Sequence, residues 1–270
     1  MKDHVITFIK GLFVGSTMLV PGVSGGSMAM ILGIYDRLIR AVSSFRKDKR
    51  KHAIFLVMFC IGALAGIALF AKPILTAIER WEKPMLYFFI GIVLGGIPLI
   101  LKKAKVHQWN WKVIVFPLLG AVSVYLLAQL PLMKFDGESE SILNILMLVA
   151  AGFVSAVALV LPGISVSYML LLLGMYDTTM RAISEFYFPF LLPLGIGLVL
   201  GILSTTKLLE SFMVRYTQGT YLVIFGFVIG SVFQIIPGMP PSNELILCIG
   251  TLCLGMVLIT LMLRLDKEEC

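Results

Sequence analysis

The chain has 270 residues, of which 59% are hydrophobic and 14% are charged, with a formal net charge of +7. This composition excludes an ordinary soluble domain. It also argues against a nucleic-acid-binding module, because in so apolar a chain an excess of Lys and Arg is typical of cytoplasmic loops at a membrane. A spanning helix needs about 20 apolar residues, and its backbone must bond internally. Six uncharged runs meet this need and predict helices at residues 53–71, 85–101, 113–130, 186–206, 216–236 and 245–263.

The first apolar segment is interrupted after only twenty residues by the sequence VPGVSGGS, residues 20–27. The 16 residues before it, 5–20, would make a helix of about 24 Å, shorter than the hydrocarbon core of about 30 Å. The apolar run after it ends at Ile34, so neither limb is long enough to cross. We therefore predict a re-entrant hairpin that dips into the membrane and turns at residues 21–27.

A second interruption, LPGISVS at residues 161–167, belongs to an internal repeat. A shift of 141 residues aligns 11–45 with 152–186 without a gap, and thirteen of the 35 aligned residues are identical. The match continues at a shift of 135, the difference being the six residues RKDKRK at 46–51. Such a match of Pro, Asp, Arg and Tyr positions predicts two copies of one unit. The copies are residues 1–133 and 142–270, joined by an acidic extracytoplasmic linker at 134–141.

The basic loops predict that the two copies have opposite orientations in the membrane. RKDKRK and KKAK (102–105) follow elements of the first copy, whereas their counterparts in the second copy carry no Lys or Arg. If the basic loops are cytoplasmic, the counterparts lie outside and both termini lie inside. The predicted fold is an all-α polytopic membrane protein with two inverted-topology repeats. Each repeat has a re-entrant Pro-Gly helical hairpin and three transmembrane helices, although 142–161 is long enough to span alone.

The interrupted segments are candidates for binding an anion. A Pro-Gly break leaves backbone groups without partners inside the helix, and the helix that follows presents its N–H groups and partial positive charge to the turn. Two inverted hairpins would bring two such ends together near the midplane, as in many transporters. The alternative is that Pro-Gly only kinks a helix that Ser24 and Ser165 cap.

Two further patterns accompany the repeat. Asp36/Arg40 and Asp177/Arg181 recur four residues apart, either as surface salt bridges or as residues that flank the mouth of a cavity. Four G-x-x-x-G pairs at repeat-matched positions predict closely packed helices. The segments PILTAIER (73–80) and LLESFMVR (208–215) are expected to form short amphipathic loop helices.

The motif pair VPGVSGGSMAMILGIYDRLI and LPGISVSYMLLLLGMYDTTM resembles the bacterial polyprenyl-phosphate transporter family, over essentially the whole chain. The resemblance implies recycling of undecaprenyl phosphate, the lipid carrier of cell-wall synthesis, from the outer to the inner leaflet of the bacterial cytoplasmic membrane. It implies no catalytic residue, metal or cofactor. The implied substrate-binding residues are Pro21, Gly22, Ser24, Gly25, Gly26, Ser27, Pro162, Gly163, Ser165 and Ser167, assisted by Arg40 or Arg181. Tyr35, Asp36, Tyr176 and Asp177 are candidates for gating or proton coupling.

One difference sets the two motifs apart, because Val166 stands where the first motif has Gly25. The two anion sites are therefore not expected to be equivalent. Polyprenyl phosphate and membrane lipids are the expected partners, and the sequence leaves open a coupling ion (proton or sodium) and a homodimer.

Two other functions fit the same chemistry. A lipid-pyrophosphate phosphatase has a Pro-Gly-x-Ser motif followed by Arg, but here Gly25 and Val166 follow the serines, so the charge stabilisation for phosphoryl transfer is missing. A transporter or channel for a small anion would need no lateral opening for a lipid tail. Competition of binding by long-chain and short-chain phosphates would distinguish such a transporter from one for a polyprenyl phosphate.

Overall fold

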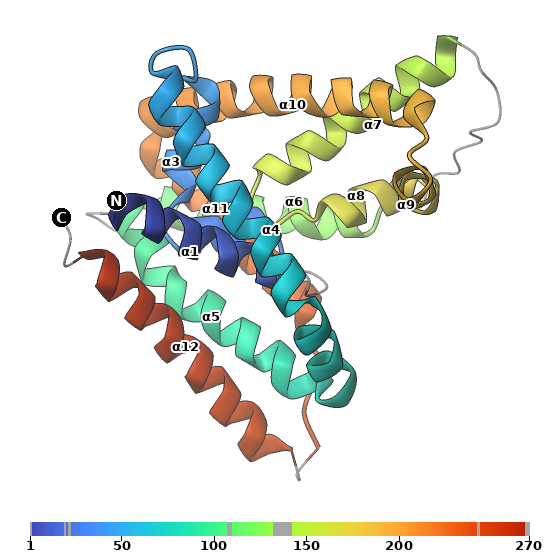
Figure 1. Cartoon of the computed structure of the whole chain (residues 1–270). Helices are drawn as coiled ribbons and strands as arrows, with labels where there is room; N and C mark the ends of the chain where they lie inside the picture. The colour runs from blue at the N-terminus through green and yellow to red at the C-terminus, as the bar shows by residue number, and fades with distance from the viewer. Residues whose placement is uncertain are drawn as a thin grey trace.

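The computed structural model describes residues 2–18, 20, 23–106, 110–131, 142–241 and 244–267, which form a bundle of helices (Figure 1). In chain order the described helices are α1 (Lys2–Thr17), α2 (Gly25–Ile31), α3 (Tyr35–Ser43), α4 (Lys49–Arg80), α5 (Glu82–Lys103), α6 (Trp111–Ala128), α7 (Ile142–Val160), α8 (Val166–Leu172), α9 (Tyr176–Ser184), α10 (Phe188–Arg215), α11 (Thr217–Ile235) and α12 (Leu245–Lys267).

The two halves of the chain follow the same order of elements. In each half one helix of intermediate length leads into a seven-residue helix and a nine-residue helix, and three long helices follow. The short helices α2 and α8 begin directly after the two Pro-Gly breaks, where the repeat in the sequence is strongest. The predicted linker, 134–141, lies outside the described residues, and the opposite orientation of the two copies stays a prediction.

Seven of the described helices are long and apolar enough to cross a membrane, namely α4, α5, α6, α7, α10, α11 and α12. Their outer faces carry many exposed large apolar side chains, such as Leu64 of α4 and Leu118 of α6. Contiguous apolar surface of this kind is expected where a helix faces lipid tails. The chain is therefore a multi-pass helical membrane protein. α7 is among the seven, whereas α1 is shorter, and whether the Pro-Gly hairpins are re-entrant stays a prediction.

Close helix pairs hold the bundle together, and the G-x-x-x-G pairs lie at their contacts. α1 packs along α4, and a Cβ atom at Gly62 or Gly66 would collide with the carbonyl oxygens of Phe8 and Leu12. α7 and α10 form the equivalent pair in the second half, where Gly197 would meet Val149. The predicted packing role of these glycines is confirmed, since only a missing side chain lets the backbones approach so closely.

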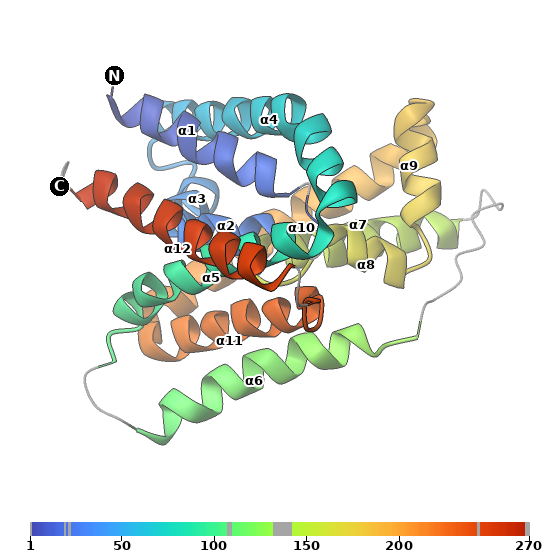
Figure 2. The ribbon, with the colours of Figure 1, turned by 90° about the horizontal axis from the view of Figure 1, so that it is seen from below.

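The other two close pairs join one half of the chain to the other. α5 packs along α12 and α11 packs along α6, so the fifth helix of each half lies against the sixth helix of the other (Figures 1 and 2). Gly91 and Gly226, which occupy equivalent repeat positions, would collide with the backbones of Leu252 and Pro117. This exchange makes the two halves one interlocked body.

The expectation of short loop helices at 73–80 and 208–215 was wrong. Both segments continue the preceding helix, as the last turns of α4 and α10. α4 has 32 residues, about 48 Å at 1.5 Å per residue, so it extends well beyond a hydrocarbon core of about 30 Å. Pro73 lies inside α4, and Figure 2 shows the helix turning in its last third. A proline removes one backbone hydrogen bond and bends a helix without ending it.

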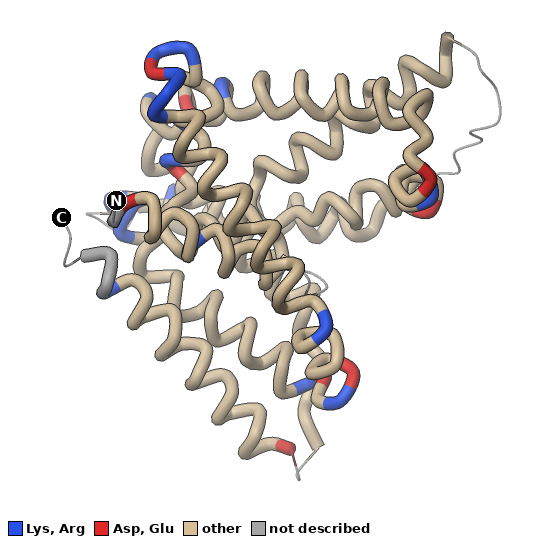
Figure 3. The backbone as a smooth tube through the Cα atoms, viewed as in Figure 1, with Lys and Arg blue, Asp and Glu red and all other residues tan. Residues whose placement is uncertain are grey.

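Charged residues gather at a few places on the bundle. Figure 3 shows most of the Lys and Arg residues on the side where the two ends of the chain lie, with smaller mixed clusters at the turn from α4 to α5 and at α9. The predicted orientation, with the basic side in the cytoplasm, stays a prediction.

Candidate functional site

The first motif leads directly into the seven-residue helix α2. Ser24 is its N-cap residue, and the first backbone bond of the helix runs from the Met28 N–H to the Ser24 carbonyl, 3.1 Å. The amides of Gly25, Gly26 and Ser27 therefore precede the hydrogen-bond ladder. Ser24 is buried and its hydroxyl makes no capping bond. Pro21 and Gly22, the other residues predicted for this motif, lie outside the described residues.

The second motif has the same backbone plan with different side chains. Gly163 has φ +85°, and a Cβ there would collide with the carbonyl oxygen of Phe227 in α11, so the position requires glycine. Ser165 is the N-cap of α8, and its hydroxyl accepts a 3.4 Å hydrogen bond from the Tyr168 N–H. Ser167 is exposed, whereas Gly26, its counterpart in the first motif, is half-buried.

The structure brings the two motifs together. A Cβ atom placed on Gly26 would lie 3.3 Å from the Cα of Pro162, and the next nearest atoms also belong to the second loop. The first turn of α2 therefore rests on the backbone of the second Pro-Gly break, although 136 positions separate the two residues in the chain (162 − 26). The two motifs are therefore in contact where the halves meet, and together they are the candidate site.

The site contains a buried hydroxyl with no hydrogen-bond partner in the part of the chain that the structure describes. Ser27 is 3% exposed, and its Oγ has no hydrogen-bond partner among the described residues. Ser155 of α7 has the same property, at 2% exposure. An unsatisfied buried hydroxyl costs roughly 1–3 kcal/mol, so such a group is uncommon unless it serves a ligand or a water.

Tyr35 and Asp36 connect the first half to its surroundings. The Tyr35 hydroxyl, fully buried, donates a 2.6 Å hydrogen bond to the carbonyl of Val160, the last residue of α7. The Asp36 carboxylate pairs with Lys103 at 2.7 Å, and its second oxygen is buried without a partner among the described residues. The proposed salt bridge from Asp36 to Arg40 is not formed. Arg40 donates its Nε–H to the Asp36 backbone carbonyl instead, at 3.2 Å.

Asp36 and Arg40 line a pocket of about 340 Å³ between the two halves, together with charged residues of α5 and α10. Glu210 of α10 accepts a hydrogen bond from Ser43 at 2.5 Å and a longer one from Ser44 at 3.4 Å. Sequence reasoning missed Lys103, Glu210 and Tyr221 as parts of this pocket. They lie outside the repeated motif. The one signal in the sequence that could have found them is a charge or a hydroxyl within an apolar helix. The full lining is Asp36, Ile39, Arg40, Lys103, Lys105, Glu210, Met213, Val214, Thr217 and Tyr221.

The equivalent residues of the second half are not brought into any comparable arrangement. Tyr176 is half-buried, and Asp177 and Arg181 are exposed on α9. Arg181 accepts a bond from Ser184 through its carbonyl, within the same helix. The two copies of the Tyr-Asp motif thus have the same local structure and different surroundings.

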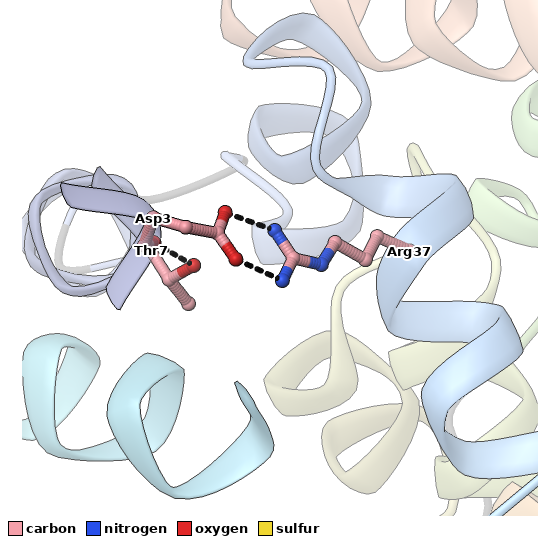
Figure 4. A network of polar contacts seen from close by, with 3 residues as sticks. All are labelled: Asp3, Thr7 and Arg37. Atoms are coloured by element: carbon pink, nitrogen blue, oxygen red, sulfur yellow. Dashed lines mark hydrogen bonds and ion pairs between the residues drawn. The ribbon is translucent and has the colours of Figure 1, made fainter. Parts of the chain in front are cut away.

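Arg37, the neighbour of Asp36, links α3 to other helices of its own half. Its guanidinium forms two 2.6 Å hydrogen bonds with the carboxylate of Asp3 at the start of α1, and Thr7 donates to the Asp3 carbonyl (Figure 4). These bonds hold the pKa of Asp3 below its usual value. Arg37 also lies over the Phe55 ring, 4.3 Å from its centroid. α3 is therefore anchored to α1 and α4 as well.

The bundle and the paired loops define a multi-pass helical membrane protein with a duplicated architecture. Comparison with protein families is more specific. Residues 14–247 match the family described as undecaprenyl phosphate translocase-like, and the chain belongs to that family.

Curated relatives agree with this assignment. The chain is 29% identical over 249 residues to a polyprenyl-phosphate transporter of Vibrio cholerae, which covers 87% of this chain and 78% of the relative. It is 32% identical over 251 residues to a polyprenyl-phosphate transporter of Staphylococcus aureus, which covers 88% of each chain. No solved structure matches the chain.

Proposed function

We propose that this protein translocates a polyprenyl phosphate, undecaprenyl phosphate in particular, from the outer to the inner leaflet of the bacterial cytoplasmic membrane. The family and the names of the two relatives supply the substrate class. The proposal also needs a place for a phosphate inside an apolar bundle and a way to reach it from either leaflet.

The contact between the two Pro-Gly motifs is the observation that carries the proposal. At this contact the amides of Gly25, Gly26 and Ser27 precede the ladder of α2, and the hydroxyl of Ser27 has no partner among the described residues. A phosphate monoester needs several N–H and O–H donors when it leaves water, because burying an unpaired charge is very costly. Hydrogen bonds to a charged group stabilise by roughly 1.5–3 kcal/mol each.

The second motif contributes less to this binding in our proposal. The hydroxyl of Ser165 already caps α8, and Val166 stands where the first motif has Gly25. Ser167 and the guanidinium groups of Arg40 and Arg181 are exposed, so they meet the phosphate on its way in or out. A site with two unequal motifs binds the phosphate chiefly through the first.

The isoprenoid tail stays in the lipid. The outward faces of the long helices are apolar, and an isoprenoid chain has no polar group that must be paired inside the protein. The phosphate then crosses by alternating access, in which the halves change their packing around the paired motifs. Asp36, whose carboxylate forms a half-buried ion pair with Lys103, is the proposed coupling group.

Reconstitution into liposomes that contain a labelled polyprenyl phosphate tests this function. Wild-type protein is compared with the variant Ser24→Ala/Ser27→Ala and with Ser204→Ala, an exposed serine of α10 that serves as control. We expect transport by the wild type and the control, about a tenfold or greater loss in the double variant, and no release of inorganic phosphate. Released phosphate would establish the phosphatase instead, and equal transport of a short-chain phosphate would establish a small-anion transporter.

A further inference from the structure

The nine-residue helix α3 is held at both ends by the opposite half of the molecule. At its start the Tyr35 hydroxyl bonds the Val160 carbonyl of α7, and at its end Ser43 bonds the Glu210 carboxylate of α10. Between these points α3 packs along α10. Its own half holds it too, through the pairs of Arg37 with Asp3 and of Asp36 with Lys103 described above. The first half therefore closes tightly against the second at α3.

Helix α9 is the copy of α3 in the second half, and it is not held in this way. It has the same length, and Tyr176, Asp177, Arg181 and Ser184 repeat the residues of α3. All of these except the half-buried Tyr176 are exposed. α9 packs mainly against α8 and α10 of its own half, and in both Figure 1 and Figure 2 it lies apart from α4.

Two copies of one unit thus take unequal positions relative to the opposite half. Local sequence does not explain this, because the two helices begin with the same Tyr-Asp pair after a glycine of positive φ, Gly33 or Gly174. The difference lies in the packing across the halves. A duplicated transporter that is closed at one copy and open at the other has a second state in which the two copies exchange roles.

We propose that α3 and α9 are alternating gates. In this structure the α3 gate is closed by Tyr35 and by the Ser43–Glu210 bond. In the second state α3 is released, and α9 closes against the end of α4. This inference rests on the proposed transport function, because alternating gates are needed only where a substrate crosses.

The repeat alignment identifies the contact that we expect in the second state. Ser184 corresponds to Ser43 at a shift of 141, and Leu75 corresponds to Glu210 at a shift of 135. Leu75 lies in the last turns of α4, and its side chain is 47% exposed, so it is free to receive α9. The α9 gate therefore closes through Leu75 and Ser184.

The two gates differ in chemistry, which sets the resting state. Where the α3 gate has Glu210 and Lys103, the α9 gate has Leu75 and Gly238. Lys103 holds α3 from its own half through Asp36, and the Ser43–Glu210 hydrogen bond closes α3 against the other half. In the second gate Ser184 meets the apolar Leu75 and gains no such bond. The state with α3 closed is the more stable one before substrate binds, in agreement with this structure.

Distances between spin labels on both gates test the proposal. The label pairs are 45 with 211 for the α3 gate and the symmetry-matched 76 with 186 for the α9 gate, through the substitutions Phe45→Cys, Ser211→Cys, Thr76→Cys and Phe186→Cys. All four residues are exposed and none forms the gate contacts themselves. The background variant has Cys60, Cys248, Cys253 and Cys270 replaced by alanine. The protein is measured in nanodiscs with and without a polyprenyl phosphate.

Without the lipid we expect a short 45–211 distance and a long 76–186 distance. With the lipid we expect a second population in which the first distance lengthens and the second shortens together. The substitution Glu210→Leu copies the α9 gate into the α3 gate. It should raise the exchanged population, read from the 76–186 pair, about tenfold without any lipid, whereas Ser211→Leu, at the exposed neighbour, should not.

Two results would refute the proposal that α3 and α9 are alternating gates. One is a single, unchanged distance for both pairs in Glu210→Leu as well as with bound lipid. The other is lengthening at 45–211 without shortening at 76–186. A protein that exchanges its distances in Glu210→Leu but binds and transports no polyprenyl phosphate would support the gates and refute the proposed function.

Discussion

The substitution Ser27→Ala should make the free protein more stable and its binding of phosphate weaker. The Ser27 hydroxyl is buried, at 3% exposure, and has no partner among the described residues, so folding leaves it unsatisfied. Removing such a group relieves roughly 1–3 kcal/mol, whereas most buried substitutions destabilise. If the hydroxyl donates to the phosphate, the same change removes a charge-assisted bond, and the affinity falls by about 10- to 100-fold.

Ser155→Ala is the matched control, because Ser155 is as buried as Ser27 and also has no partner among the residues described, but lies outside both motifs. Thermal unfolding in detergent, followed by circular dichroism, should show Tm raised by a few degrees in both variants. Titration with a polyprenyl phosphate should show weaker binding in Ser27→Ala only. A lower Tm for Ser27→Ala, or unchanged affinity in that variant, would refute the assignment of this hydroxyl to the substrate.

Three further changes test the rest of the site. Gly163→Ala should lower Tm strongly, since left-handed backbone and a backbone collision together cost roughly 2–5 kcal/mol, whereas Gly195→Ala, with open space around it, should leave Tm unchanged or raise it. Tyr35→Phe should destabilise by about 1–3 kcal/mol because a buried carbonyl loses its donor, and Tyr176→Phe should not; equal effects in thermal unfolding would contradict the asymmetry. Lys103→Met should slow transport at least tenfold by leaving a half-buried carboxylate unpaired, and full transport in liposomes would exclude that ion pair from the cycle.

Much of the architecture was predictable because its signals are local or repeat along the chain. Uncharged runs marked the long helices, and the four G-x-x-x-G pairs marked their close contacts. The alternative interpretation of the two motifs had Ser24 and Ser165 cap a helix; both stand at N-cap positions, and of the two only Ser165 makes a capping bond. The family resemblance also rested on linear motifs, and the family is confirmed. Each of these depends on neighbours within a few residues or on a comparison of the chain with itself.

The end of α4 was not predictable in the same way. The uncharged run was predicted to end at residue 71 and a separate loop helix to follow at 73–80, and the structure has one continuous helix to Arg80. Charge and proline indicate where a helix leaves the membrane or bends, and they do not by themselves end it. Packing of the neighbouring helices decides whether it continues.

The sequence by itself determined that the chain is a duplicated helical membrane protein with two Pro-Gly motifs. Only the tertiary structure decided that Gly26 rests on Pro162, that Asp36 pairs with Lys103 instead of Arg40, and that α5 packs with α12 across the halves. It also decided that α3 bonds the opposite half through Tyr35 and Ser43, whereas Asp177, Arg181 and Ser184 of α9 are exposed. α3 and α9 share five of their nine residues and still take different positions, because each position depends on contacts with distant segments whose residues differ between the halves.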